Sequence, residues 1–240
     1  MVMGANYKTD AACAILMFGL LFAGPSFSSG MKPASSVVLI SEDQGETTMN
    51  VTNTDKYAAL LYTSLETIPE DPELLLVVSP PVARVEGGDS QAVRFILQNK
   101  KPFTVQRLMR VTFEGIPTVQ YKVPNSVGVT FRQNLPVIIS PKGLKIEAAP
   151  WKFLKWSLCG DTLHVTNDSP YVVRLALSGS LQPVAEEVKF SKAYILPSTH
   201  HEFQIGRVIT GATSMRIHPA SVYGYALNQF DTPLSACTSQ

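Results

Sequence analysis

The sequence predicts an all-β protein built from two β-sandwich domains, and three observations support this expectation. Short runs in which apolar and polar residues alternate recur from Thr47 onward, with the period of two that is typical of half-buried strands. The 17 prolines and 15 glycines are spread between these runs, which favours many short strands over a few long helices. The alternation breaks at SPKGL, residues 140–144, and then restarts, as expected of a linker between two domains.

The first 29 residues have the layout of a secretory signal peptide. A single lysine, Lys8, precedes an apolar run over residues 11–23, and Gly24, Pro25 and small serines follow this run. The run is too short for a comfortable membrane span. We therefore expect a soluble, exported protein of about 210 residues, which is enough for two domains of about 100 residues each.

Several runs of the first half have well-defined inward positions. In TTMNVTN, Met49 and Val51 share one face, and the turn at residues 53–55 ends the strand. The runs QAVRFIL and RLMRVTF repeat this pattern. Their predicted inward residues are Val93, Phe95, Leu97, Met109, Val111 and Phe113.

The run SVGVTFRQNLPVIIS, residues 126–140, is different in kind, because its large apolar side chains alternate with unusually small or polar ones. The apolar positions are Val127, Val129, Phe131, Leu135, Val137 and Ile139. Taken alone, this pattern is typical of a core strand of a sandwich.

The second half continues in the same way after the linker. In DTLHVTNDSPYVVRLALSGSL, the sequence predicts one strand with Leu163 and Val165 on one face, then a turn over residues 167–170. A second strand is predicted to carry one row of apolar residues. These are Tyr171, Val173, Leu175 and Leu177.

Charge and the chemistry-bearing residues exclude several function classes. A net charge of +1 gives no electrostatic footprint for nucleic acid or an acidic membrane. His200 and His201 are adjacent and would point to opposite faces of a strand, while His164 and His218 are isolated in the sequence, so we expect no metal site. No nucleophile, base and orienting group come together, so we expect neither an enzyme nor a cofactor.

Two cysteines remain after removal of the signal, Cys159 and Cys237, in a compartment that permits oxidation. They are interpreted either as a structural disulfide or as two buried thiols. A disulfide would close a long loop and contribute roughly 4 kcal/mol in the chain-entropy account.

With both halves in view, the stretch SPPVARVEGGDSQAVRF resembles the signature of the PapD-like periplasmic chaperones of the chaperone-usher pathway. Three further segments, VTNTD, RLMRVTFEGIP and LHVTNDSPYVVRLALSG, resemble other motifs of that family in the right order. The residues of the signature that match are Pro80, Pro81, Arg84, Glu86, Gly87, Gln91 and Arg94.

The resemblance implies two immunoglobulin-like domains set at an angle in an L or boomerang shape, over residues 30–141 and 142–240. It also implies a periplasmic chaperone that binds pilus subunits in the cleft between the domains and delivers them to an outer-membrane usher. Such chaperones donate their last first-domain strand to a subunit by β-augmentation. The residues that would fill the subunit groove are Val127, Val129 and Phe131.

The sequence departs from the family at the positions that usually anchor the subunit's C-terminal carboxylate. An ungapped alignment places Val37 where the family has an arginine and Pro136 where it has a lysine. Arg132 and Lys142 flank Pro136 and are the candidate substitutes, because a buried carboxylate needs a charged partner. Arg94 is expected to make a structural ion pair that helps hold the domain angle.

Two alternatives stay open at this point. The chain would be a secreted structural or adhesive protein if residues 127–139 were buried on both faces and unable to pair with a guest. The free chaperone would cap its own apolar donor strand by forming a homodimer, because an exposed strand edge favours such pairing.

Overall fold

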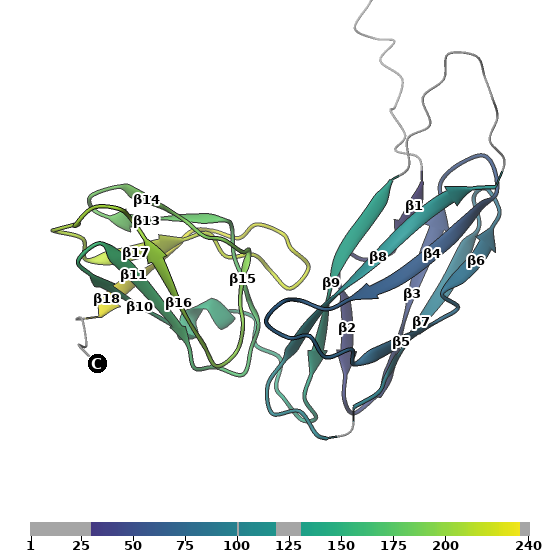
Figure 1. Ribbon diagram of the computed structural model, residues 1–240, viewed down its shortest axis with the longest axis horizontal. Coiled ribbons are helices and arrows are strands. Elements are labelled where there is room, and N and C mark those ends of the chain that lie inside the picture. Colours follow the sequence, from purple (N-terminus) through teal and green to yellow (C-terminus); the bar gives the residue numbers. More distant parts are fainter. Residues whose placement is uncertain (1–29, 100, 119–130, 236–240) are drawn as a thin grey trace, which may run out of the picture.

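The computed structural model describes residues 30–99, 101–118 and 131–235 (Figure 1). Within these residues the chain folds almost entirely into short strands, with one 3-10 helix, η2 (Pro150–Phe153), and no α-helix. The same residues contain no helix of the length and apolar character needed to span a membrane. The expected all-β class with two sandwich domains is confirmed, whereas the expected signal peptide lies outside the described residues.

The first domain consists of a four-stranded and a five-stranded sheet. The four-stranded sheet has the order β1-β3-β7-β5, formed by β1 (Met31–Pro33), β3 (Glu46–Asn53), β7 (Ser90–Leu97) and β5 (Leu76–Ser79). The five-stranded sheet has the order β2-β9-β8-β4-β6, formed by β2 (Val38–Ser41), β9 (Arg132–Ser140), β8 (Arg107–Pro117), β4 (Ala59–Glu66) and β6 (Val82–Val85).

The core of the first domain lies between these two sheets. The alternation predicted for β3, β7 and β8 is confirmed, because the predicted inward residues all belong to one apolar cluster. At its centre, Phe95 of β7 meets Phe113 of β8 edge to face, with ring centroids 6.4 Å apart. Leu135, Val137 and Ile139 of β9 join the same cluster, so this half of β9 is a core strand.

The second domain consists of a seven-stranded and a two-stranded sheet. The seven-stranded sheet has the order β14-β13-β17-β18-β10-β11-β16, formed by β14 (Glu186–Lys189), β13 (Ser178–Gln182), β17 (Ser214–Ile217), β18 (Phe230–Ser235), β10 (Leu154–Cys159), β11 (Thr162–Asn167) and β16 (Thr199–Gln204). The two-stranded sheet pairs β12 (Val173–Arg174) with β15 (Tyr194–Ile195). Trp156, with the predicted inward residues Leu163 and Val165, lies at the core.

The single strand predicted for residues 171–177 is wrong in its length. β12 covers only Val173 and Arg174, and the backbone then changes partners: Leu175 N donates to Ala193 O, whereas Ala176 N donates to His218 O. The chain therefore leaves one sheet for the other, as at a sandwich corner, and Leu177 ends up 56% exposed.

The VTN motif of each domain has the same structural role. Asn53 and Asn167 are fully buried at the ends of β3 and β11, and each side-chain amide donates to backbone carbonyls of a neighbouring segment. Each side-chain oxygen accepts the backbone N–H two residues ahead, which forms an Asx turn. The two asparagines therefore terminate equivalent strands without leaving a buried amide unsatisfied.

An apolar cluster joins the two domains, which lie side by side in Figure 1. Its buried members come from both domains and are Val37, Ile68, Leu108, Ile138, Val172 and Leu196. Gln106 adds polar contacts across the same junction: its N–H donates to Pro170 O (2.8 Å), and its Oε1 accepts from Val172 N (2.9 Å). Because an apolar contact and directional hydrogen bonds act together, the relative position of the domains is well specified.

An ion pair also crosses the interface. Lys192 of the second domain donates to the carboxylate of Glu70, which lies in the first domain between β4 and β5 and also accepts from Tyr194. Burial acts to raise the pKa of Glu70, but hydrogen bonds from Lys192, from its own backbone N–H and from Tyr194, together with the charge of Lys192, lower it below its usual value. The hydrogen bond from Lys192 to Glu70 correspondingly raises the pKa of Lys192.

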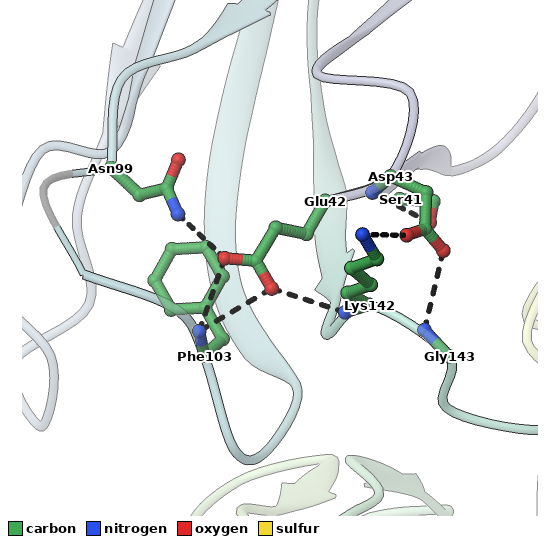
Figure 2. Close-up of polar contacts among 7 residues, drawn as sticks. All are labelled: Ser41, Glu42, Asp43, Asn99, Phe103, Lys142 and Gly143. Atoms are coloured by element: carbon green, nitrogen blue, oxygen red, sulfur yellow. Dashed lines mark hydrogen bonds and ion pairs between the residues drawn. The ribbon is translucent and has the colours of Figure 1, made fainter.

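The linker is attached to the first domain by Glu42 and Asp43, the residues that follow β2 (Figure 2). The Glu42 carboxylate accepts hydrogen bonds from Asn99 Nδ2 (2.6 Å), Phe103 N (3.1 Å) and Lys142 N (3.0 Å). Asp43 accepts from Gly143 N (3.2 Å) and lies 4.0 Å from Lys142 Nζ. The Glu42 carboxylate thus ties the start of the linker to the loop between β7 and β8.

Cys159, at the end of β10, is disulfide-bonded, so its interpretation as a free buried thiol is wrong. Cys237, the expected partner, lies outside the described residues.

We predict that Glu42→Ala lowers the free energy of unfolding by about 1–3 kcal/mol, because it leaves several backbone and side-chain donors without their acceptor. Chemical denaturation of the variant and the wild type measures this difference. Asp43→Ala is the matched control, and its expected effect is at most about 1 kcal/mol because its ion pair is exposed. Equal losses in the two variants would contradict the role given to Glu42.

We predict that the interdomain ion pair stabilises the protein only above acidic pH. The pKa of Glu70 is lowered from 4.5 in the folded protein, so its contribution is complete above that pH and is lost as the pH falls below it. Glu70→Gln should therefore lower the melting temperature at pH 7, by an amount equivalent to roughly 1 kcal/mol or less, and change it little near pH 3. A difference between wild type and variant that persists unchanged at pH 3 would rule out an ionic contribution.

Candidate functional site

The strand β9 has an open edge over half of its length. It pairs with β8 from Arg132 to Ile139, but it pairs with β2 only from Val137 to Ser140. Within the described part of the chain, residues 132–136 therefore have a strand partner on one side only. The backbone groups on the other side can pair with an extended segment of another protein.

Phe131 stands directly before β9 and is 52% exposed, which is unusual for a phenylalanine. A Cβ atom on Gly30 would lie 3.7 Å from Phe131 Cβ, so the side chain rests against the backbone at that position. Phe131 has the same alternation phase as Leu135 and Val137 of the core. Val127 and Val129, the other two predicted groove-filling residues, lie outside the described residues.

Pro136 lies in β9 at the limit of the open edge and is buried opposite Arg110 of β8. Proline has no backbone N–H, and in sheets it is confined mainly to edges, bulges and strand starts. Pro136 therefore lies at the end of the segment of β9 that pairs only with β8.

The two cations expected to replace the family anchor already have carboxylate partners in the first domain. Arg132 Nη2 lies 2.8 Å from Glu114 Oε2, and this hydrogen bond raises the pKa of Arg132. Lys142 lies in the linker beside Asp43, with a side chain that is 81% exposed (Figure 2). Neither position has the low exposure expected of an anchor for a buried carboxylate.

Two other arginines, one from each domain, lie two residues beyond Leu108 and Val172 of the interdomain cluster and so face the domain interface. Arg110 of β8 donates hydrogen bonds to two oxygens of Asn134: Nε to the side-chain oxygen, and Nη2 to the backbone oxygen (2.9 Å). Arg174 of β12 donates to Val222 O (2.6 Å) and lies against Gly224, where a Cβ atom would be 3.1 Å from its Nη2. Both side chains are partly buried.

The positive charge of Arg110 acts on Arg174 across the domain interface. Burial lowers the pKa of Arg110, against the opposing effects of Glu66 and Tyr194. Burial also lowers the pKa of Arg174, and the charge of Arg110 lowers it further. Within the described residues, neither arginine is within ion-pair distance of a carboxylate.

Both guanidinium groups remain charged, because arginine does not deprotonate in proteins. Two partly buried cations that repel each other create a favourable position for an anion, above all a carboxylate that can accept bidentate hydrogen bonds. Two partly buried arginines thus face the domain interface without a carboxylate partner among the described residues.

Val37, which the ungapped alignment places at the family's arginine position, is 2% exposed and packs in the apolar cluster between the domains. Arg110 lies two residues beyond Leu108 on the same face of β8, next to this cluster. Sequence reasoning missed Arg110 and Arg174, although each is an arginine within a largely apolar run, RLMRV and YVVRLAL. An arginine within an apolar run is a weak signal by itself. Only the strand register shows that both arginine side chains face the domain interface.

The remaining predicted structural residues lie in the first domain. Arg94 of β7 is 3.9 Å from Glu46, and both side chains are more than half exposed. Arg94 thus makes the expected ion pair, but within one sheet of the first domain, whereas Gln106 and Glu70 make the contacts between the domains. Pro80 and Pro81 form the turn between β5 and β6, and Pro81 O accepts from Thr63 N (2.8 Å).

Comparison with known proteins gives consistent results over both domains. Residues 30–145 match the family "Pili and flagellar-assembly chaperone, PapD N-terminal domain", and residues 149–228 match "Pili assembly chaperone PapD, C-terminal domain". The chain is 41% identical over 212 residues to "Uncharacterized fimbrial chaperone YhcA" of Escherichia coli (strain K12), which covers 87% of this chain and 92% of that protein.

Solved structures resemble the fold. The E. coli chaperone DraB superimposes with a TM-score of 0.69 at 20% identity, covering 86% of this chain and 99% of that one. The SafB chaperone structure, described as Salmonella enterica SafA pilin in complex with SafB, gives a TM-score of 0.69 at 18% identity and covers 88% and 99%. These likenesses show that the two-domain fold is shared.

Proposed function

Since the chain belongs to the PapD family of pili and flagellar-assembly chaperones, we propose that it is a periplasmic chaperone that stabilises fimbrial subunits by donor-strand complementation. The observation that carries this proposal is the open edge of β9 over residues 132–136. A subunit that lacks its own last strand would pair with this edge through backbone hydrogen bonds.

The proposed donor residues are Val127, Val129 and Phe131, which would fill the groove of the subunit. The exposure of Phe131 at the start of the open edge supports this role, because a large apolar side chain gains burial when a partner covers it. For the valines, the support is the alternating sequence pattern and the family resemblance.

We propose that Arg110 and Arg174 bind the C-terminal carboxylate of the subunit in place of the family's arginine and lysine. Their partial burial, mutual repulsion and lack of a carboxylate partner among the described residues support this assignment. Because one arginine comes from each domain, a bound carboxylate would also join the two domains.

The finer steps follow from the family. The first 29 residues would direct export, residues 30–141 and 142–240 would form the two domains, and the loaded chaperone would deliver its subunit to an outer-membrane usher. Without a subunit, the open edge of β9 would favour capping by a second copy.

A purely structural or adhesive role is not favoured. That role predicts a strand before the linker that is enclosed on both sides, whereas residues 132–136 pair only with β8 within the described part of the chain. The family consists of assembly chaperones, and donor-strand binding needs no catalytic group.

We predict that Phe131→Asp leaves the chaperone folded but reduces the recovery of co-expressed fimbrial subunits at least tenfold, because a charge cannot enter an apolar groove. Affinity purification and quantitative mass spectrometry measure the recovered subunit. Val82→Asp is the matched control, since Val82 is similarly exposed (49%) on β6, the opposite edge strand of the same sheet. Equal recovery with both variants would refute the donor-strand assignment.

We predict that the wild-type protein binds the C-terminal peptide of its subunit at least tenfold more tightly as the free acid than as the amide. Arg110→Gln and Arg174→Gln should each reduce this preference strongly, whereas the control Arg216→Gln, which removes an ion pair with Asp231, should retain it. Titration calorimetry with both peptides measures the ratio. An acid preference that survives in Arg110→Gln and Arg174→Gln would show that the carboxylate binds elsewhere.

A further inference from the structure

The outer face of the second domain carries a cluster of metal-ligating side chains that its strand register brings together. β11 and β16 are antiparallel neighbours, with His164 opposite Glu202 and Thr166 opposite His200. Residues opposite each other in a sheet share a face, so His164, His200 and Glu202 all lie on the same side. His164 is thus not isolated, contrary to the expectation from the sequence.

The distances within this cluster fit a single metal ion. His164 Nδ1 lies 3.3 Å from His200 Nε2, and Glu202 Oε1 lies 3.5 Å from each of these nitrogens. A tetrahedral zinc ion with bonds of about 2.0–2.1 Å holds its ligand atoms about 3.3–3.4 Å apart. The three atoms therefore already have the separation of one face of a zinc tetrahedron.

Thr166 orients one of the ligands. Its Oγ1 lies 3.0 Å from His200 Nδ1, and when it accepts the Nδ1–H it leaves the Nε2 lone pair directed into the cluster. The rings of His164 and His200 stack with centroids 5.4 Å apart, which holds the two imidazoles side by side. The cluster is therefore preorganised by a strand register, a hydroxyl group and a ring contact.

We propose that His164, His200 and Glu202 form a binding site for a divalent transition-metal ion of the zinc class, with an open position toward solvent. Two imidazoles and one carboxylate suit Zn²⁺ and Cu²⁺, whereas Mg²⁺ and Ca²⁺ require oxygen ligands. β16 is an edge strand of the seven-stranded sheet, so the ion ties this edge to β11 through side chains as well as the backbone ladder. The site is independent of subunit binding, which the proposed function assigns to β9 and the domain interface.

His201, the neighbour of His200, does not belong to the site. It lies on the other face of β16, opposite Val165, and burial lowers its pKa. His218 is exposed and lies outside β11 and β16. These two histidines are the remaining ones among the four of the chain, so they serve as internal controls.

The test uses the mature protein purified without a histidine tag and stripped of metal with EDTA. Titration calorimetry with Zn²⁺ is expected to show one site per chain, Cu²⁺ to bind more tightly, and Mg²⁺ not to bind. Zn²⁺ should also raise the melting temperature, because an ion that binds only the folded state stabilises it. Failure of Zn²⁺ to bind or to stabilise the protein would overturn the proposal.

Single substitutions identify the residues that bind the ion. His164→Gln, His200→Gln and Glu202→Gln should each weaken Zn²⁺ binding at least tenfold and abolish the rise in melting temperature, and Thr166→Val should weaken binding severalfold. His218→Gln should bind like the wild type. Unchanged binding in the three ligand variants, or equal loss in His218→Gln, would show that the ion binds elsewhere or without specificity.

Discussion

The antiparallel pairing of β9 with β8 is the interaction on which the rest of the structure depends. It fixes the register that sends Leu135, Val137 and Ile139 into the first core, and it places Pro136 opposite Arg110. Because β2 accompanies β9 only from Val137 onward, the same strand is part of the core at one end and has an open edge at the other. One continuous element thus supports the first core and carries the open edge that we propose a guest completes.

The domain interface combines an apolar cluster with two partly buried positive charges. The apolar cluster around Val37 and Leu108 excludes water and fixes the domains against each other. Beside it, Arg110 and Arg174 hold two positive charges under partial burial, which is costly unless an anion approaches. Val37, which the ungapped alignment places at the family's arginine position, belongs to the apolar contact, and the proposed replacement for that anchor takes one arginine from β8 and one from the other domain.

Strand register also explains the metal-ligand cluster. His164 and His200 are 36 positions apart, and only the antiparallel pairing of β11 with β16 places them on one face with Glu202. The proposed donor edge and the proposed metal site both involve strands that lack a neighbouring strand on one side. These are β9 over its open half and β16 at the sheet edge. An edge is where a sandwich has free backbone groups and accessible side chains, so new binding properties can arise there without disturbing either core.

The sequence by itself determined the all-β class, the two-domain organisation and most inward positions, because alternation with a period of two is a local property of the chain. The VTN turns and the membership of Phe95 or Val165 in a core follow from residues close in sequence. Only the tertiary structure decided the breaking of the strand at Leu175, the pairing of Arg132 and Lys142 with Glu114 and Asp43, and the placement of Arg110 and Arg174 at the domain interface. Such contacts depend on the register between strands and on the docking of two domains, and these are set by the summed packing of many distant residues, which no local pattern encodes.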